Sequence, residues 1–118
     1  MRQLSGLALG VLLAMAAGDA RATLMSVSNE ALPQGSNLAT CLQRGAQAIA
    51  AMGMQPLNPT SAASWGQRDG GRIFSVYCMP DRNAAVVIGA GPDGQEVGPD
   101  VTNLAAAFRN TGATRPLK

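Results

Sequence analysis

Residues 62–79, AASWGQRDGGRIFSVYCM, decide the fold, because two runs typical of β-strands flank the turn sequence DGG at residues 69–71. Aspartate followed by two glycines supplies the positive-φ positions that a tight hairpin turn requires. Residues 62–68 and 72–79 are therefore predicted to pair as a hairpin. A third run rich in β-branched residues, at 84–88, follows a second turn, so the sequence predicts a meander of three strands.

Side chains alternate between the two faces of a strand, which separates the middle strand into two sets. One set is Phe74, Val76 and Cys78, and the other is Ile73, Ser75, Tyr77 and Met79. The first set is expected to face the core, with Cys78 pointing inward.

An amphipathic helix precedes the meander. Its apolar positions recur at three- and four-residue spacing: Leu38, Cys41, Leu42, Gly45, Ile49 and Met52. Ser36 or Asn37 is expected to cap the start, and Gly53 suits a left-handed C-terminal cap. Cys41 therefore also lies on a buried stripe.

A second helix is predicted after the glycine- and proline-rich segment 89–98, beginning near Pro99 or Asp100 and ending at Asn110 to Gly112. Its apolar stripe is Val101, Leu104, Ala105 and Phe108. With a short first strand at residues 23–28, the predicted fold class is α+β in the order β-α-β-β-β-α. Both helices are expected on one face of a mainly antiparallel sheet of three to four strands.

The N-terminus has the three regions of a secretion signal: Arg2, an apolar stretch at residues 7–17, and the A-x-A sequence Ala20-Arg21-Ala22. A membrane anchor is the competing interpretation, but these eleven apolar residues would span roughly 16 Å as a helix, about half of the hydrocarbon thickness. We therefore expect a signal peptide at residues 1–22 and no membrane anchor after cleavage.

The chain of 118 residues then divides into the signal, a single small domain at residues 23–112 and a flexible tail at 113–118. Export predicts a periplasmic or secreted location. The mature part carries seven basic and six acidic residues, and its only lysine is Lys118. This balance lacks the clustered positive charge typical of nucleic-acid binders, so no nucleic-acid partner is expected.

The chain contains two cysteines. Exported proteins meet an oxidising compartment, so a structural disulfide between Cys41 and Cys78 is the economical interpretation. Free thiols, a catalytic redox pair and a metal site are the alternatives. Redox pairs usually have C-x-x-C spacing, and two cysteines without histidine do not complete a tetrahedral zinc site.

Four runs resemble a loose group of small exported bacterial proteins of unknown function: TCLQRGAQAIAAMGM, WGQRDGGRIFSVYCMP, AAVVIGAG and LAAAF. Members of that group pair a cysteine of the first helix with one in a hairpin strand. The resemblance implies an α+β fold with one helix-to-strand disulfide, and it transfers no activity.

The absence of histidine removes the commonest general base and metal ligand, so a Ser-His-Asp triad is impossible. Residues 89–94, GAGPDG, match G-x-G-x-x-G, but a dinucleotide site needs a later parallel strand and acidic residue, so a plain loop is favoured. Asp93, Glu96 and Asp100 do not have the spacing of a calcium loop. We predict no catalytic residue, no metal and no cofactor.

Two groups of residues remain as candidate sites. Arg68 and Arg72, with Arg82 as a possible neighbour, could form an anion contact, but edge charges that discourage aggregation are the favoured explanation. Ile73, Tyr77 and Met79 are expected on a sheet face that the helices leave uncovered, and Trp65 is either part of it or ordinary packing.

The favoured function is a non-enzymatic binding or interaction module of the cell envelope. It would contact a protein partner, a second copy of itself or a small ligand through the uncovered face. A histidine-independent enzyme or an enzyme inhibitor is the alternative, and a purely structural small protein is the third possibility.

Overall fold

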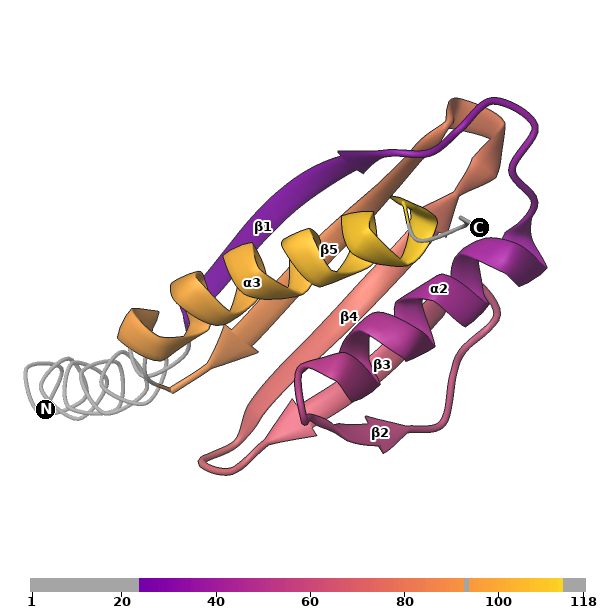
Figure 1. The fold of residues 1–118 in the computed structure, drawn as a ribbon. Coiled ribbons are helices and arrows are strands. Elements are labelled where there is room, and N and C mark those ends of the chain that lie inside the picture. The colour runs from indigo at the N-terminus through magenta and orange to yellow at the C-terminus, as the bar shows by residue number, and fades with distance from the viewer. Residues whose placement is uncertain (1–23, 93, 114–118) are drawn as a thin grey trace, which may run out of the picture.

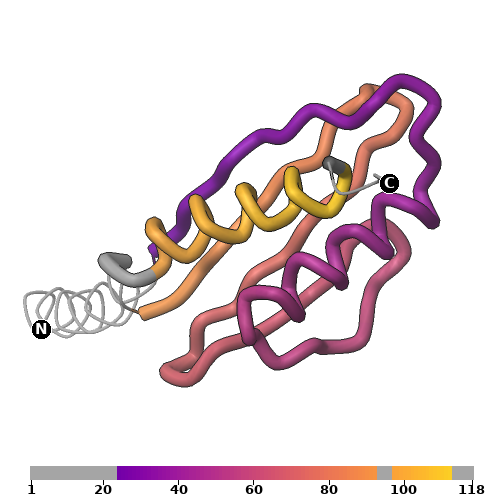
Figure 2. Tube along the Cα trace, in the orientation of Figure 1, coloured from indigo at the N-terminus to yellow at the C-terminus, as the bar shows by residue number. Residues whose placement is uncertain are grey.

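The computed structural model describes residues 24–92 and 94–113. Its elements follow the chain in the order β1 (Leu24–Ala31), α2 (Leu38–Ala51), β2 (Gln55–Leu57), β3 (Ala63–Arg68), β4 (Arg72–Met79), the 3-10 turn η1 (Pro80–Arg82), β5 (Ala84–Gly91) and α3 (Gly94–Ala113). Figure 1 shows both helices lying against one side of the sheet, and Figure 2 follows the same path as a tube.

The strands form one sheet in the order β1-β5-β4-β3-β2, with antiparallel pairing throughout. The α+β class and the three-stranded meander are confirmed. The predicted strand number was wrong, because the described chain forms five strands and not three to four. The missed strand is β2, a three-residue edge strand containing Pro56. A proline is tolerated there because an edge strand needs ladder hydrogen bonds on one side only.

Helix α3 begins at Gly94, five residues before the predicted start at Pro99, and β5 continues to Gly91. Segment 89–98 is therefore not the predicted loop. Val97 explains the longer helix, because its side chain is 1% exposed and extends the stripe of Val101 by one turn. Burying this side chain offsets the hydrogen bond that Pro99 removes from the second turn.

The core lies between the sheet and the two helices. Exposure alternates along β5, so that Ala85, Val87, Gly89 and Gly91 are buried under the helices. The core cluster comprises Leu32, Cys41, Ala48, Ile49, Met54, Phe74, Val76, Cys78, Ala85, Val87, Val97, Val101, Leu104, Ala105 and Phe108. The predicted placement of both helices on one face agrees with this alternation.

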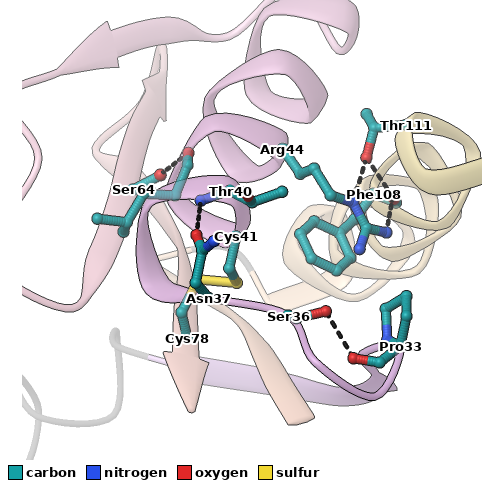
Figure 3. Close-up of a disulfide and its surroundings, with 11 residues drawn as sticks. Pro33, Ser36, Asn37, Thr40, Cys41, Arg44, Ser64, Cys78, Phe108 and Thr111 are labelled. Atoms are coloured by element: carbon teal, nitrogen blue, oxygen red, sulfur yellow. Dashed lines mark hydrogen bonds between the residues drawn. A yellow bond between two sulfur atoms is a disulfide. The ribbon is translucent and has the colours of Figure 1, made fainter. Parts of the chain in front are cut away.

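Cys41 and Cys78 form a disulfide, with their Cα atoms 6.1 Å apart. The bond joins α2 to β4, as the two periodicities predicted. Figure 3 shows it beside the start of α2, where the Asn37 side chain accepts a hydrogen bond of 2.8 Å from the Thr40 backbone N–H. Of the two predicted caps, Asn37 is the one that acts, and Gly53 adopts the expected positive φ of 72°.

Two predictions fall on other parts of the chain. The signal peptide at residues 1–22 and residues 114–118 of the predicted tail lie outside the described residues, whereas Ala113 is the last residue of α3. In the described part, no helix is both long enough and apolar enough to cross a membrane.

Candidate interaction surface

The side of the sheet opposite the helices is the largest candidate site, and we call it the open face. Residues directly opposite one another in the ladder share a face, so the register defines its members. They are Met25, Val27, Asn29 and Ala31 of β1; Ala84, Val86, Ile88 and Ala90 of β5; Ile73, Ser75, Tyr77 and Met79 of β4; Ala63, Trp65 and Gln67 of β3; and Gln55 and Leu57 of β2.

Large apolar side chains on this face are exposed. Met25 is 66% exposed, Val27 55% and Tyr77 42%, while Ile73 and Met79 are partly exposed. Strand spacing of about 4.8 Å and a rise of about 3.3 Å per residue give the open face an area of roughly 500 Å². This area is that of the whole face, which also includes the uncharged polar residues Asn29, Gln55, Gln67 and Ser75, so the exposed apolar patch within it is smaller.

No member of the open face carries a charge, although one would expect polar residues on a solvated sheet face. The charged residues of the described strands are Glu30, Arg68 and Arg72, and all three lie on the side that the helices cover. Each of them has a partner on α3. A sheet with a solvated outer face usually carries its charged residues on that face, whereas this sheet carries them on the side that the helices cover.

Arg68 and Arg72 converge on one carboxylate. Arg72 Nη1 lies 3.0 Å from Asp100 Oδ2, and Arg68 Nε lies 3.4 Å from the same oxygen. Arg68 Nη2 also donates to the Met52 carbonyl at 2.7 Å, which satisfies the end of α2, and Arg72 Nε donates to the Asp69 carbonyl at 3.0 Å. The two arginines thus tie the hairpin to both helices.

The same arginines line a hollow of about 380 Å³ at the β3–β4 turn, together with Gly53, Gln55, Gln67, Asp69, Gly70 and Gly71. Asp69 and Asp100 balance their charge, so the site has no local excess of positive charge. An anion contact at Arg68 and Arg72 stays a prediction. The proximity of Arg82 considered from the sequence is wrong, because Arg72 is the first residue of the eight-residue strand β4, whereas Arg82 is in η1, after the end of this strand.

The G-x-G-x-x-G sequence lies at the junction of β5 and α3. The helix does open at Gly94, but both neighbours of β5 are antiparallel, and no strand follows α3 in the described residues. A Cβ atom on Gly89 would meet Val101 Cγ2 at 2.6 Å and Phe74 Cε2 at 2.8 Å. This glycine therefore permits close packing of α3 on the sheet, and core side chains occupy the space beside it.

The three carboxylates that were considered as calcium ligands differ in their surroundings. Asp100 bridges Arg68 and Arg72, Asp93 lies outside the described residues, and Glu96 is in the first turn of α3. Among the described residues, no three His, Cys, Asp or Glu side chains cluster closely enough to hold a metal ion.

A second hollow, of about 220 Å³, separates α2 from the segment leading from β2 to β3. Its lining is Leu42, Gln43, Ala46, Ile49, Pro56, Leu57, Pro59, Ser64 and Trp65. The Trp65 indole N–H donates to Thr60 Oγ1 at 2.9 Å. Trp65 therefore has a local partner, and by register it also belongs to the open face.

The surroundings of the disulfide hold the two helices together (Figure 3). Arg44 of α2 stacks over the Phe108 ring at 4.2 Å and donates to the Phe108 carbonyl at 2.9 Å and to Thr111 Oγ1 at 3.0 Å. Ser64 of β3 donates to the Leu42 carbonyl at 2.7 Å. This end of the molecule has a structural role.

The sequence placed Ile73, Tyr77 and Met79 on one face, and the structure brings them together with Met25 and Val27 of β1. The alternation of β1 assigns each of its side chains to a face, but it does not reveal which strand lies beside β1.

No protein-family model matches the chain, and the comparison with curated proteins finds no match either.

Proposed function

We propose that this protein is a non-enzymatic interaction module of an exported compartment and that it binds a partner protein through the open face. The observation that carries the proposal is the absence of charge from a face with exposed Met25, Val27 and Tyr77, while every charged strand residue lies under the helices. Exposing such a surface costs free energy that a partner recovers by covering it.

A protein partner fits this surface better than a small ligand. Small-molecule sites are concave and enclose their ligand, whereas the open face is the broad outer side of a sheet. Tyr77 lies on β4, the central strand of five. Aromatic residues near the centre of a protein interface commonly contribute most of the binding energy.

The disulfide supports the compartment part of the proposal. Such bonds form and persist in oxidising environments and are rare in the cytosol, and the Cys41–Cys78 bond joins core elements. This bond and the signal predicted at residues 1–22 together support a periplasmic or secreted location.

Crosslinked pull-down of the exported protein from its own envelope, followed by mass spectrometry, tests the proposal. The recovered partner is then purified, and its affinity is measured for wild type, Tyr77→Lys and the control Gln47→Lys, which adds the same charge at an exposed position on α2. We expect Tyr77→Lys to weaken binding by about tenfold or more. Recovery of no specific partner, or equal affinity for both lysine variants, would refute the proposal.

Binding of a small anion at Arg68 and Arg72 is a second candidate, supported by the shared hollow at the β3–β4 turn. The alternative of a histidine-independent enzyme or an enzyme inhibitor would use the same groups. Titration with inorganic phosphate, followed by the NMR shifts of the Gly70 and Gly71 amides, tests the anion contact. Unmoved amide signals in the millimolar range would refute it.

A further inference from the structure

The two edges of the sheet are protected to different degrees. The β2 edge has three residues with Pro56 at its centre, and these are features with which natural sheets discourage edge pairing. The β1 edge has eight residues, LMSVSNEA, without proline, lysine or arginine, and it pairs with β5 along its whole length without a bulge. Figure 1 shows β1 as the outer strand on its side of the sheet.

The backbone groups on the outer side of β1 can be assigned. Leu32 N–H donates to the Asn83 carbonyl at 2.8 Å, so Leu32 directs its backbone toward the β5 side. The backbone N–H and C=O groups of successive residues point alternately to the two sides of a strand. The N–H and C=O groups of Met25, Val27, Asn29 and Ala31 therefore point away from β5, toward the free edge of the sheet. Among the described residues, no strand pairs with this edge.

We propose that the outer edge of β1 pairs antiparallel with β1 of a second copy of this chain, forming one continuous sheet of ten strands about a two-fold axis. The register that uses all four outward residues places Val27 opposite the partner's Asn29 and Met25 opposite the partner's Ala31. Ser28 then lies on the two-fold axis, facing the partner's Ser28.

A second copy fits this edge because no like charges meet across the seam. Glu30 is the one charged residue of β1, and Arg109 already binds it on the helix side at 2.8 Å. In the proposed register Glu30 faces the partner's Ser26. An isologous contact of this kind closes on itself, so it pairs both β1 edges and leaves the β2 edges outermost.

Pairing would also enlarge the binding surface, a consequence that rests on the proposed function. The two-fold axis is perpendicular to the sheet, so both open faces lie on the same side and all four helices lie on the other. The joined face has roughly 1,000 Å², twice the single face. One face falls short of the about 800 Å² that each partner contributes to a standard interface, whereas two reach it.

Cysteine crosslinking tests the register. Full-length protein is expressed in an exporting host, and the recovered Ser28→Cys variant is treated with an oxidant that takes two electrons from the two thiols and releases two protons. Ser28 forms a non-hydrogen-bonded pair across the axis, where Cα atoms lie about 4.5 Å apart, so a crosslinked dimer is expected. The control Ser26→Cys has the same side-chain direction but is offset by four residues, about 14 Å, and should not crosslink.

Sedimentation equilibrium tests the edge itself. Asn29→Pro removes an outward N–H and leaves the β5 ladder intact, so it should convert the dimer to a monomer, while Asn29→Ala should remain dimeric. A retained Cys41–Cys78 bond and unchanged circular dichroism show that the variant folds. A monomeric wild type well above micromolar concentration, a dimer that survives Asn29→Pro, or crosslinking by Ser26→Cys would overturn the proposal.

The two proposals fail separately. If Tyr77→Lys abolishes the dimer and Asn29→Pro does not, the copies stack through their open faces, and edge pairing is wrong. If Asn29→Pro abolishes the dimer while Tyr77→Lys leaves the affinity for the partner unchanged, edge pairing is supported and the proposed binding function is wrong.

Discussion

Arg109 of α3 donates a hydrogen bond of 2.8 Å to the carboxylate of Glu30 on β1. The Glu30 side chain is 6% exposed, whereas that of Arg109 is 59% exposed. The pair therefore anchors a buried charge with an arginine that reaches in from solvent. It holds the outer strand of the sheet against the helix that covers it.

Removing the arginine should leave the buried carboxylate without a strong partner, because the other donor that the described residues give it, Ser28 Oγ, lies 3.5 Å away. Arg109→Ala is expected to lower the free energy of unfolding by about 1 to 2 kcal/mol. Urea denaturation measures the change. Arg82→Ala, at an exposed position in η1, is the matched control and should change stability little.

Loss of the disulfide should be more costly. Cys41 and Cys78 are separated by 37 residues in the sequence. In the chain-entropy model, closing a loop of this length lowers the conformational entropy of the unfolded chain and raises its free energy by about 4 kcal/mol. The double variant Cys41→Ala, Cys78→Ala should lose about that much stability in denaturant unfolding. Reductant should destabilise wild type and leave the double variant unchanged. A thiol-alkylation mass shift on unreduced protein would show instead that the cysteines are free.

Two glycines should respond differently to replacement by alanine. At Gly89 the new Cβ would collide with Val101 and Phe74, so Gly89→Ala is expected to destabilise by about 1 to 3 kcal/mol. At Gly98, inside α3, a Cβ atom would meet nothing within 4 Å beyond its own helix and chain neighbours, but Pro99 follows directly, and its ring crowds a Cβ on the preceding helical residue. This crowding opposes the gain in helix propensity of about 0.5 to 1 kcal/mol, so Gly98→Ala should change stability little. Thermal unfolding measures both changes. A harmless Gly89→Ala would contradict the packing role assigned to this glycine.

The shared carboxylate gives a further prediction. Asp100→Asn leaves the guanidinium groups of Arg68 and Arg72 close together without their anion, so stability should fall by about 1 to 2 kcal/mol. Added salt should reduce the loss, since it screens like charges that are partly exposed. Asp81→Asn, at an exposed site in η1, is the control and should show neither effect. Equal stability of both variants would show that Asp100 is dispensable.

Local patterns were sufficient for several elements. The helical spacing from Leu38 to Met52, the DGG turn and the strand alternation around Cys78 each depend on residues close in the chain, and all were confirmed. Proline misled the prediction in two places. No strand was predicted around Pro56, and Pro99 was taken to start a helix. The cost of each proline is local, whereas the pairing of β2 with β3 and the burial of Val97, which offset this cost, depend on residues far away in the chain.

The candidate site was predicted in part. Ile73, Tyr77 and Met79 were assigned to one face by alternation, but Met25 and Val27 were not, because nothing in their local pattern says that β1 lies beside β5. The convergence of Arg68 and Arg72 on Asp100 was also missed. A hairpin brings the arginines together locally, whereas the aspartate arrives from a helix 28 residues beyond Arg72.

By itself the sequence determined what short-range periodicity can carry: the helix that contains Cys41, the hairpin strand that contains Cys78, and the inward direction of both sulfurs. Only the tertiary structure decided which strands are neighbours, that β1 and β2 are the edges, and that the charges lie beneath the helices. The physical reason is that a strand has two faces and two edges. Its own alternation assigns side chains to the faces, but contacts between residues far apart in the chain decide what covers each face and what pairs with each edge.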